Sequence, residues 1–350
     1  MKTAKKEGMR PGIWMAMIAV LLGTAVICIG AGSVYIAPGD TIRTVWNAIT
    51  GQPLPEGVSG PIILSVRIPR VLCAALIGAA LSLCGAAMQG LFRNPLADGS
   101  TLGVSSGGAL GAAVAIVLEI SIPGIPLAGN IVMAMIFAFG SLMMILTMAY
   151  SMDRSLSTQT IILIGVIFSM LASALLSLLF AFAGDKLKSV TFWTMGSLSG
   201  RNMTHVLILA IGTVLFGGLL LCRSRELNHF ALGEENARRV GVQVRKVKLE
   251  ILIAVSSLIG VCVAVGGSIA FVGLIVPHMV RMITGPNHRK LLPVSMLGGA
   301  VFLMLTDLLA RTVISPVELP IGVVTSLIGA ITFAAIFRSS RKGGNRRAEH

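Results

Sequence analysis

The segment Gly103 to Gly107 matches G-x-S-x-G, the nucleophile elbow of many serine hydrolases. In such a site the serine attacks an acyl carbon, and a histidine held by an acid activates the serine. The elbow needs a turn between a strand and a helix, whereas this segment opens an apolar helix. No apolar segment pairs a suitable histidine with it, so an intramembrane protease is the weaker interpretation. We favour close helix packing by small residues, with hydroxyl groups satisfying backbone atoms.

Metal, redox and nucleotide chemistry find little support in the sequence. The five cysteines form no C-x-x-C pair and the five histidines no H-E-x-x-H motif, so neither a disulfide framework nor a metal site is predicted. The dipeptide Gly-Lys is absent, which excludes a P-loop. We therefore expect no catalytic residue, and no metal or cofactor bound by this chain. If it serves ATP-driven transport, a separate ATPase subunit would hydrolyse the ATP.

Three arginines, Arg67, Arg70 and Arg311, lie at the predicted outer ends of two membrane spans. They could place their charges among lipid headgroups. Alternatively, they form a cationic rim that receives carboxylates of an outer partner through charge-assisted hydrogen bonds. Asp307 precedes Arg311 by one turn and could pair with it. Other acidic residues are nearly absent from the apolar segments, which argues against proton- or sodium-coupled transport.

Residues 231–242 predict a short helix punctuated by glycines at 233 and 241. Glu234 and Glu235 stand in its first turn and Arg238 near its end, which suits the helix dipole. Glu234 and Arg238 also have the i,i+4 spacing of a favourable ion pair. One interpretation is a solvated amphipathic helix within a loop. The other is a docking helix for a cytoplasmic partner.

The composition places these residues in a membrane protein. The chain has 350 residues, of which 55% are hydrophobic and only 12% charged, against about 25% charged in soluble domains. Too few charges remain to cover a soluble surface. The net charge of +14 is explained by Lys and Arg in cytoplasmic loops, and no basic stretch is interleaved with aromatics, so no nucleic-acid partner is expected.

The apolar runs predict an all-α polytopic protein with about ten membrane spans. A single domain covers 1–350, with a ten-helix membrane part at 13–337, cytoplasmic tails at 1–12 and 338–350, and a basic cytoplasmic loop at 223–248. The spans are expected at 13–29, 71–92, 102–118, 127–150, 159–182, 205–222, 249–270, 271–282, 291–309 and 320–337. The first run exceeds the ~7–15 residues of a signal-peptide core, so we interpret it as a span. Residues 35–66 are expected to form a polar outer loop, and 183–204 to contain a short interfacial helix.

The charge distribution supports this topology with both termini in the cytoplasm. Of the 28 Lys and Arg residues, 21 fall on predicted cytoplasmic segments. Such an excess of positive charge marks the cytoplasmic side of a membrane protein. The eighth predicted span, interrupted by Pro277, is too short to cross ~30 Å as a regular helix, so we expect it to be partly buried.

Several segments together resemble the permease subunits of type II ABC importers, the iron-siderophore, haem and cobalamin permease family. The resemblance runs in family order from about residue 67 to 330. It is carried by Arg67-Ile68-Pro69-Arg70, Gln89-Gly90, Asn94-Pro95-Leu96-Ala97, Leu102 to Gly107, Leu232 to Gly241, Gly273 to His278 and Glu318 to Thr325. Each segment alone is a weak signal, whereas the set is specific.

The resemblance implies a fold like that of the cobalamin importer permease, in the bacterial cytoplasmic (inner) membrane. It also implies partners: a second permease copy or paralogue, two cytoplasmic ATP-binding-cassette ATPase subunits, and an extracytoplasmic substrate-binding protein. Ferric siderophore is the cargo that family frequency favours, and haem or cobalamin are the alternatives. An ion-coupled secondary transporter, which would need no ATPase partner, is the more distant alternative.

The same resemblance implies roles for particular residues. Arg67, Arg70 and Arg311 would receive glutamates of the binding protein. The helix that couples to the ATPase would contain Gly233, Glu234, Ala237, Arg238 and Gly241. The cytoplasmic gate would contain Asn94, Leu96, Ser157 and Thr158, although Gln159-Thr160 lacks the basic residue that often follows the Ser-Thr pair.

Overall fold

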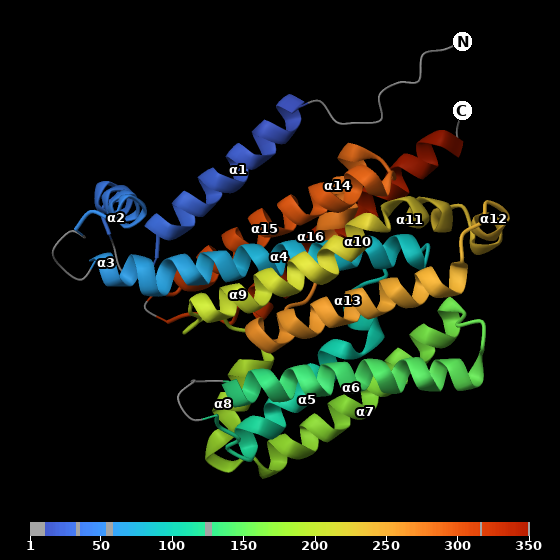
Figure 1. The fold of residues 1–350 in the computed structure, drawn as a ribbon, viewed down its shortest axis with the longest axis horizontal. Coiled ribbons are helices and arrows are strands. Elements are labelled where there is room, and N and C mark those ends of the chain that lie inside the picture. The colour runs from blue at the N-terminus through green and yellow to red at the C-terminus, as the bar shows by residue number, and fades with distance from the viewer. Residues whose placement is uncertain (1–10, 33–35, 54–58, 123–127, 316, 349–350) are drawn as a thin grey trace.

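The computed structural model describes residues 11–32, 36–53, 59–122, 128–315 and 317–348. Within these ranges the chain forms a bundle of long helices whose axes run roughly side by side (Figure 1). The start of α1 (Pro11–Gly30) and the end of α16 (Ile321–Ala348) point towards the same end of the bundle as the short helix α12 (Glu234–Arg239). This arrangement fits an even number of membrane crossings.

Among the residues that the structure describes, ten helical segments have the apolar composition of membrane spans. Seven are long, namely α1 (Pro11–Gly30), the continuous helix Ile62–Leu91, α6 (Ala128–Met152), α7 (Thr158–Phe182), the continuous helix Met203–Cys222, α13 (Val244–Gly266) and α15 (His288–Thr312). Three apolar helices are shorter, namely α5 (Val104–Val117), α14 (Val272–Thr284) and the apolar part Ile321–Ala335 of α16 (Ile321–Ala348). The predicted all-α fold of about ten spans is confirmed.

Short elements connect these spans. They are α2 (Pro38–Thr50), α3 (Ser59–Pro61), the 3-10 turns η2 (Gly99–Leu102) and η3 (Gly184–Lys186), α8 (Leu187–Thr194), α11 (Ser224–Ala231) and α12. The short helix expected within 183–204 is therefore present as α8. The connection expected as a polar loop over 35–66 instead contains α2 and the start of a span.

The helix α4 (Ile68–Leu91) is largely enclosed by other helices. It contacts α15, α14, α13 and α9 (Met203–Gly212). Glycines allow the closest crossings: a β-carbon at Gly78 would overlap the carbonyl of Gly299 in α15, and one at Gly85 would overlap that of Gly273 in α14. Small residues at such crossings let backbones approach, as in other membrane helix pairs.

Two spans contain a π-helical turn, η1 (Ile62–Arg67) before α4 and η4 (Thr213–Gly217) between α9 and α10 (Gly218–Cys222). Pro69 lacks a donor N–H, yet the helix continues through it. In the η1 turn before it, the N–H of Ile68 bonds five residues back, to the carbonyl of Ile63. The span predicted to begin at residue 71 therefore begins earlier, at Ile62.

The G-x-S-x-G segment is a packing element. Gly103 has a φ of 73°, a conformation that favours glycine, and it precedes the first turn of α5. At Gly107 a β-carbon would lie 2.6 Å from Oγ of Ser141 in α6, closer than such atoms can approach. The small residues thus hold α5 against α6, as the packing interpretation predicted.

Candidate functional site

At the end of the bundle opposite α12, buried ion pairs connect α4 with α15, and a hydrogen bond connects α15 with α1. Asp307 of α15 accepts hydrogen bonds from Nε of Arg70 at 3.0 and 3.1 Å and lies 3.3 Å from Nε of Arg311. Arg70 also donates from a terminal nitrogen to Glu318, at 2.9 Å. Arg311 donates to the carbonyl of Cys28 in α1. The pair that the sequence suggested between Asp307 and Arg311 is confirmed.

Arg67 belongs to the same end of the bundle and binds the last turn of α1. Its guanidinium donates to the carbonyls of Ile29 and Gly30 at 2.9 and 2.6 Å. Because the last carbonyls of a helix have no partners within it, a cation is well placed there. Arg67 thereby fixes α1, which otherwise has little buried surface.

The three arginines are buried, whereas the sequence suggested a cationic rim exposed to an outer partner. Arg67, Arg70 and Arg311 are 4%, 6% and 3% exposed, and Asp307 is 1% exposed. Inside the protein, Asp307 and Glu318 supply negative charge to this group of arginines. The carbonyls of α1 add hydrogen bonds to Arg67 and Arg311. The outermost member is Glu318, whose side chain is 34% exposed. A role of the three arginines in docking a binding protein stays a prediction.

At the opposite end, the predicted short helix is α12. Gly233 and Gly241 bound it with φ angles of 110° and 88°, which only glycine adopts readily. Ala237 is fully buried, whereas Arg238 is exposed, as are the apolar Leu232 and Val240 on either side of the helix. Exposed apolar residues flanking charged ones form a surface suited to a protein partner.

The ion pairs of α12 differ from the predicted one. Glu235 pairs with Arg239 at 2.7 Å, while Glu234 turns inward to Nζ of Lys248 at 2.5 Å. The prediction of an ion pair between Glu234 and Arg238 is therefore wrong. Glu234 pairs instead with a cation on the following span, which its spacing to Arg238 could not reveal.

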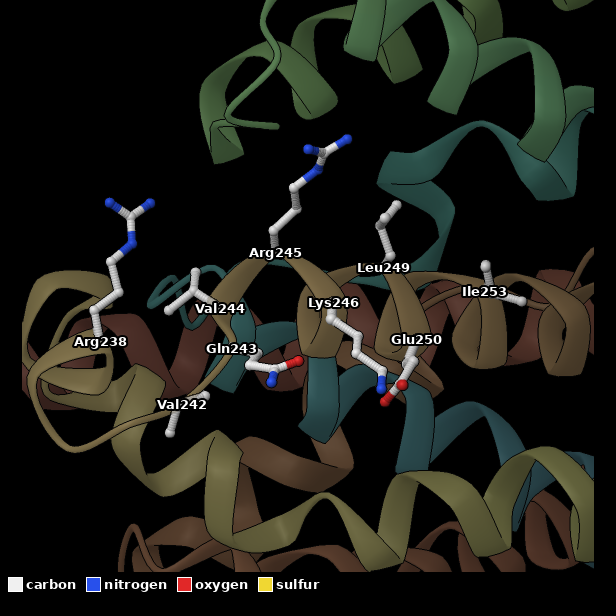
Figure 2. Close-up of a pocket in the computed structure, with 9 residues that line it drawn as sticks. All are labelled: Arg238, Val242, Gln243, Val244, Arg245, Lys246, Leu249, Glu250 and Ile253. Atoms are coloured by element: carbon white, nitrogen blue, oxygen red, sulfur yellow. The ribbon is translucent and has the colours of Figure 1, made fainter.

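An open hollow of about 690 Å³ lies beside α12, along the first turns of α13. Figure 2 shows Arg238 of α12 and Arg245 of α13 extending to one side of the hollow, and Lys246 and Glu250 to the other. The guanidinium of Arg245 lies 4.8 Å from the ring centroid of Tyr150. This cation–π contact joins the start of α13 to the end of α6.

Two turns at this end contain the residues predicted as a gate. In the first, Asn94 accepts a hydrogen bond from the N–H of Leu96 at 2.9 Å, and both side chains are exposed. In the second, Ser157 caps α7 by accepting from the N–H of Thr160, while Thr158 begins the helix. The structure leaves their role as a gate untested.

Asp153 organises the second turn, and sequence analysis did not select it. Its carboxylate accepts from the N–H and the hydroxyl of Ser155 at 2.8 and 2.6 Å, and from the N–H of Ser157 at 3.0 Å. Hydrogen bonds to the ionised form, first from Ser155 and then from Ser157, hold the pKa of Asp153 well below its usual range. The available signal was the spacing Asp-x-Ser-x-Ser, which is typical of a capping turn.

Lys248 was also missed, because it was counted among the cations of the 223–248 loop. The structure starts α13 at Val244, so Lys248 stands within the helix and is fully buried. Its Nζ donates to the carbonyl of Leu156 at 2.9 Å as well as pairing with Glu234. Glu318 was quoted only as part of a family motif, and its sequence distance from Arg70 gave no sign that they pair.

Comparisons with known proteins agree with this architecture. The profile of the FecCD transport family matches residues 18–339. The hemin transport system permease protein HmuU of Yersinia pestis is 37% identical over 95% of this chain and 97% of its own. The molybdate import system permease protein MolB of Haemophilus influenzae is 36% identical, with the same coverage. A solved structure described as an inward-facing metal-chelate type ABC transporter has a TM-score of 0.83 and 36% identity, covering 94% of this chain and 100% of its own.

Proposed function

The chain belongs to the FecCD transport family of ABC importer permeases, and from this premise we propose that it carries an iron chelate, a ferric siderophore, into the cytoplasm. The observation that supports this cargo is its likeness, at a TM-score of 0.83, to a protein described as a metal-chelate type transporter. HmuU, named for hemin, is a relative whose cargo is also an iron chelate. MolB, named for molybdate, makes an oxyanion the specific alternative.

The proposed assembly contains two permease copies, or this chain and a paralogue, in the bacterial cytoplasmic membrane. A substrate-binding protein delivers the chelate from outside, and two ATPase subunits bind and hydrolyse ATP on the cytoplasmic side. The exposed apolar surface of α7, of whose span only 22% is buried, supports a further partner within the membrane, either lipid or the second copy.

In the proposed mechanism the permease does no chemistry on its cargo. The ATPase subunits bind α12, whose exposed Arg238 is flanked by the apolar Leu232 and Val240. Closure of the ATPase pair on ATP moves α12 and shifts the helix bundle between two packings. The turns at Asn94–Leu96 and Ser157–Thr158 then open a path to the cytoplasm. A bundle with few charges suits a large chelate that is held weakly.

Reconstituted uptake tests the cargo. The chain would be inserted in vesicles with its candidate ATPase and binding protein and supplied with labelled ferric siderophore, haem, cobalamin or molybdate. We expect ATP-dependent uptake of the ferric siderophore, lost when the binding protein is omitted. Vesicles without ATP but with an imposed ion gradient are the control. Uptake of molybdate or cobalamin without siderophore uptake would contradict the proposed cargo.

A further inference from the structure

Lys248 is the largest charged side chain that the described part of the protein buries completely. It lies in the second turn of α13, and its ammonium has two partners from different segments. One is the carbonyl of Leu156, at 2.9 Å, and the other is Oε1 of Glu234, at 2.5 Å. A buried ammonium without such partners would be strongly unfavourable, so both contacts are needed to hold it there.

Leu156 belongs to the turn that contains two of the proposed gate residues. It has a φ of 53°, which is unfavourable for leucine, and its side chain is 1% exposed. The next residue, Ser157, caps α7. Lys248 therefore holds the backbone of this turn directly before the start of α7. A displacement of Lys248 would move the carbonyl of Leu156 and with it the cap of α7.

Glu234 is the first residue of α12, the proposed contact with the ATPase. Gly233, with a φ of 110°, and Gly241, with a φ of 88°, stand at the two ends of this six-residue helix. These positions suit backbone movement around a small rigid element. The ion pair with Lys248 connects this glycine-bounded helix to α13. In the low dielectric of the interior, such a pair resists separation more than an exposed pair does.

We propose that Lys248 is a positioning residue that transmits movement of α12 to the gate turn at Leu156 and Ser157. This inference rests on the function proposed above for those two segments. When α12 moves, Glu234 must take Lys248 with it or leave a buried charge unpaired. Because the same ammonium holds the carbonyl of Leu156, the position of α12 biases the conformation of the gate turn. ATP hydrolysis and opening of the gate are thereby coupled through one side chain.

Variants of the pair test this inference in the reconstituted importer. Lys248→Met removes the charge and keeps the length of the side chain, and Glu234→Gln removes the charge of the partner. The measured quantity is cargo transported per ATP hydrolysed. We expect this ratio to fall by at least about fivefold in each variant, because mutations along a coupling path change coupling by such amounts. Lys188→Met, which changes an exposed lysine of α8 in the same way, is the matched control and should keep the wild-type ratio.

The double variant Lys248→Met with Glu234→Gln distinguishes coupling from loss of structure. If the two residues act as one unit, the double variant lowers the ratio no further than either single variant. Thermal unfolding in detergent checks the fold, and Glu234→Gln keeps the test valid if Lys248→Met fails to insert, because Glu234 is partly exposed. A wild-type ratio in Glu234→Gln would overturn the inference. Failure of the wild-type protein to show ATP-driven uptake would instead overturn the proposed function.

Discussion

Asp307 is the acid that two buried arginines, Arg70 and Arg311, share. It is 1% exposed and lies within 3.3 Å of both Arg70 and Arg311. Replacing a whole buried ion pair by apolar residues is often harmless, but removing one partner leaves an uncompensated charge. Asp307 therefore determines whether the ends of α4 and α15 stay together.

The variant Asp307→Asn is expected to destabilise the protein by about 3–5 kcal/mol, because Arg70 and Arg311 lose their shared charge partner. Thermal unfolding of the purified protein in detergent measures the change. Glu318→Gln is the matched control, because its side chain is 34% exposed and its pair with Arg70 should contribute less than about 1 kcal/mol. Equal midpoints for Asp307→Asn and Glu318→Gln would show that the buried network does not stabilise this end of the bundle.

At the scale of elements, most spans could be predicted because an apolar run of about twenty residues can satisfy its backbone in lipid only as a helix. Their ends were harder to predict. The basic residues at 67 and 70 suggested a membrane boundary, yet the helix extends past them to Ile62 because a carboxylate and backbone carbonyls from other helices bind the two guanidinium groups. Lys248 belongs to a basic stretch that favours a loop, yet it lies within α13 because Glu234 pairs with it. Partners distant in sequence leave no local pattern.

The turn before α7 should weaken in acid. Its hydrogen bonds hold the pKa of Asp153 below the value of about 3.9 for an unfolded chain, so the unfolded state binds protons more readily. The stabilisation by Asp153 is thus complete above about pH 4 and is lost as the pH falls further towards the lowered pKa. Unfolding midpoints of the wild type and Asp153→Asn, measured from pH 7 to pH 3, check this. We expect the difference between the two unfolding midpoints to become smaller as the pH falls. A difference that stays constant over this pH range would contradict the prediction.

The crossing of α4 and α15 should tolerate no added side chain. Gly299→Ala places a methyl group against the carbonyl of Gly78 and is expected to destabilise the protein by about 1–3 kcal/mol. Gly140→Ala in α6 is the matched control, because no atom lies within 4 Å of its added carbon. We expect Gly140→Ala to leave the free energy of unfolding unchanged or to raise it by up to about 1 kcal/mol, since alanine favours helices. Unfolding in detergent measures both, and equal effects would contradict the close crossing.

At the scale of the whole molecule, the two ends of the bundle differ in whether their arginines are buried or exposed. At one end, the arginines are buried, where they pair with Asp307 and Glu318 and donate hydrogen bonds to carbonyls of α1. At the other end, α12 exposes Arg238 and Arg239, with its own acids paired. Composition and charge counting could predict which segments share an end. They could not predict which charges are buried, because that depends on how the helices cross.

The π turn at Thr213–Gly217 holds one residue more than the α-helical turn it replaces. A single insertion in the evolution of this span would be absorbed in this way, without rotating the segments on either side. The span Met203–Cys222 can therefore lose one residue at this turn and become α-helical there, while α11 keeps its orientation. We expect chain lengths to drift more readily here than at the glycine crossings of α4.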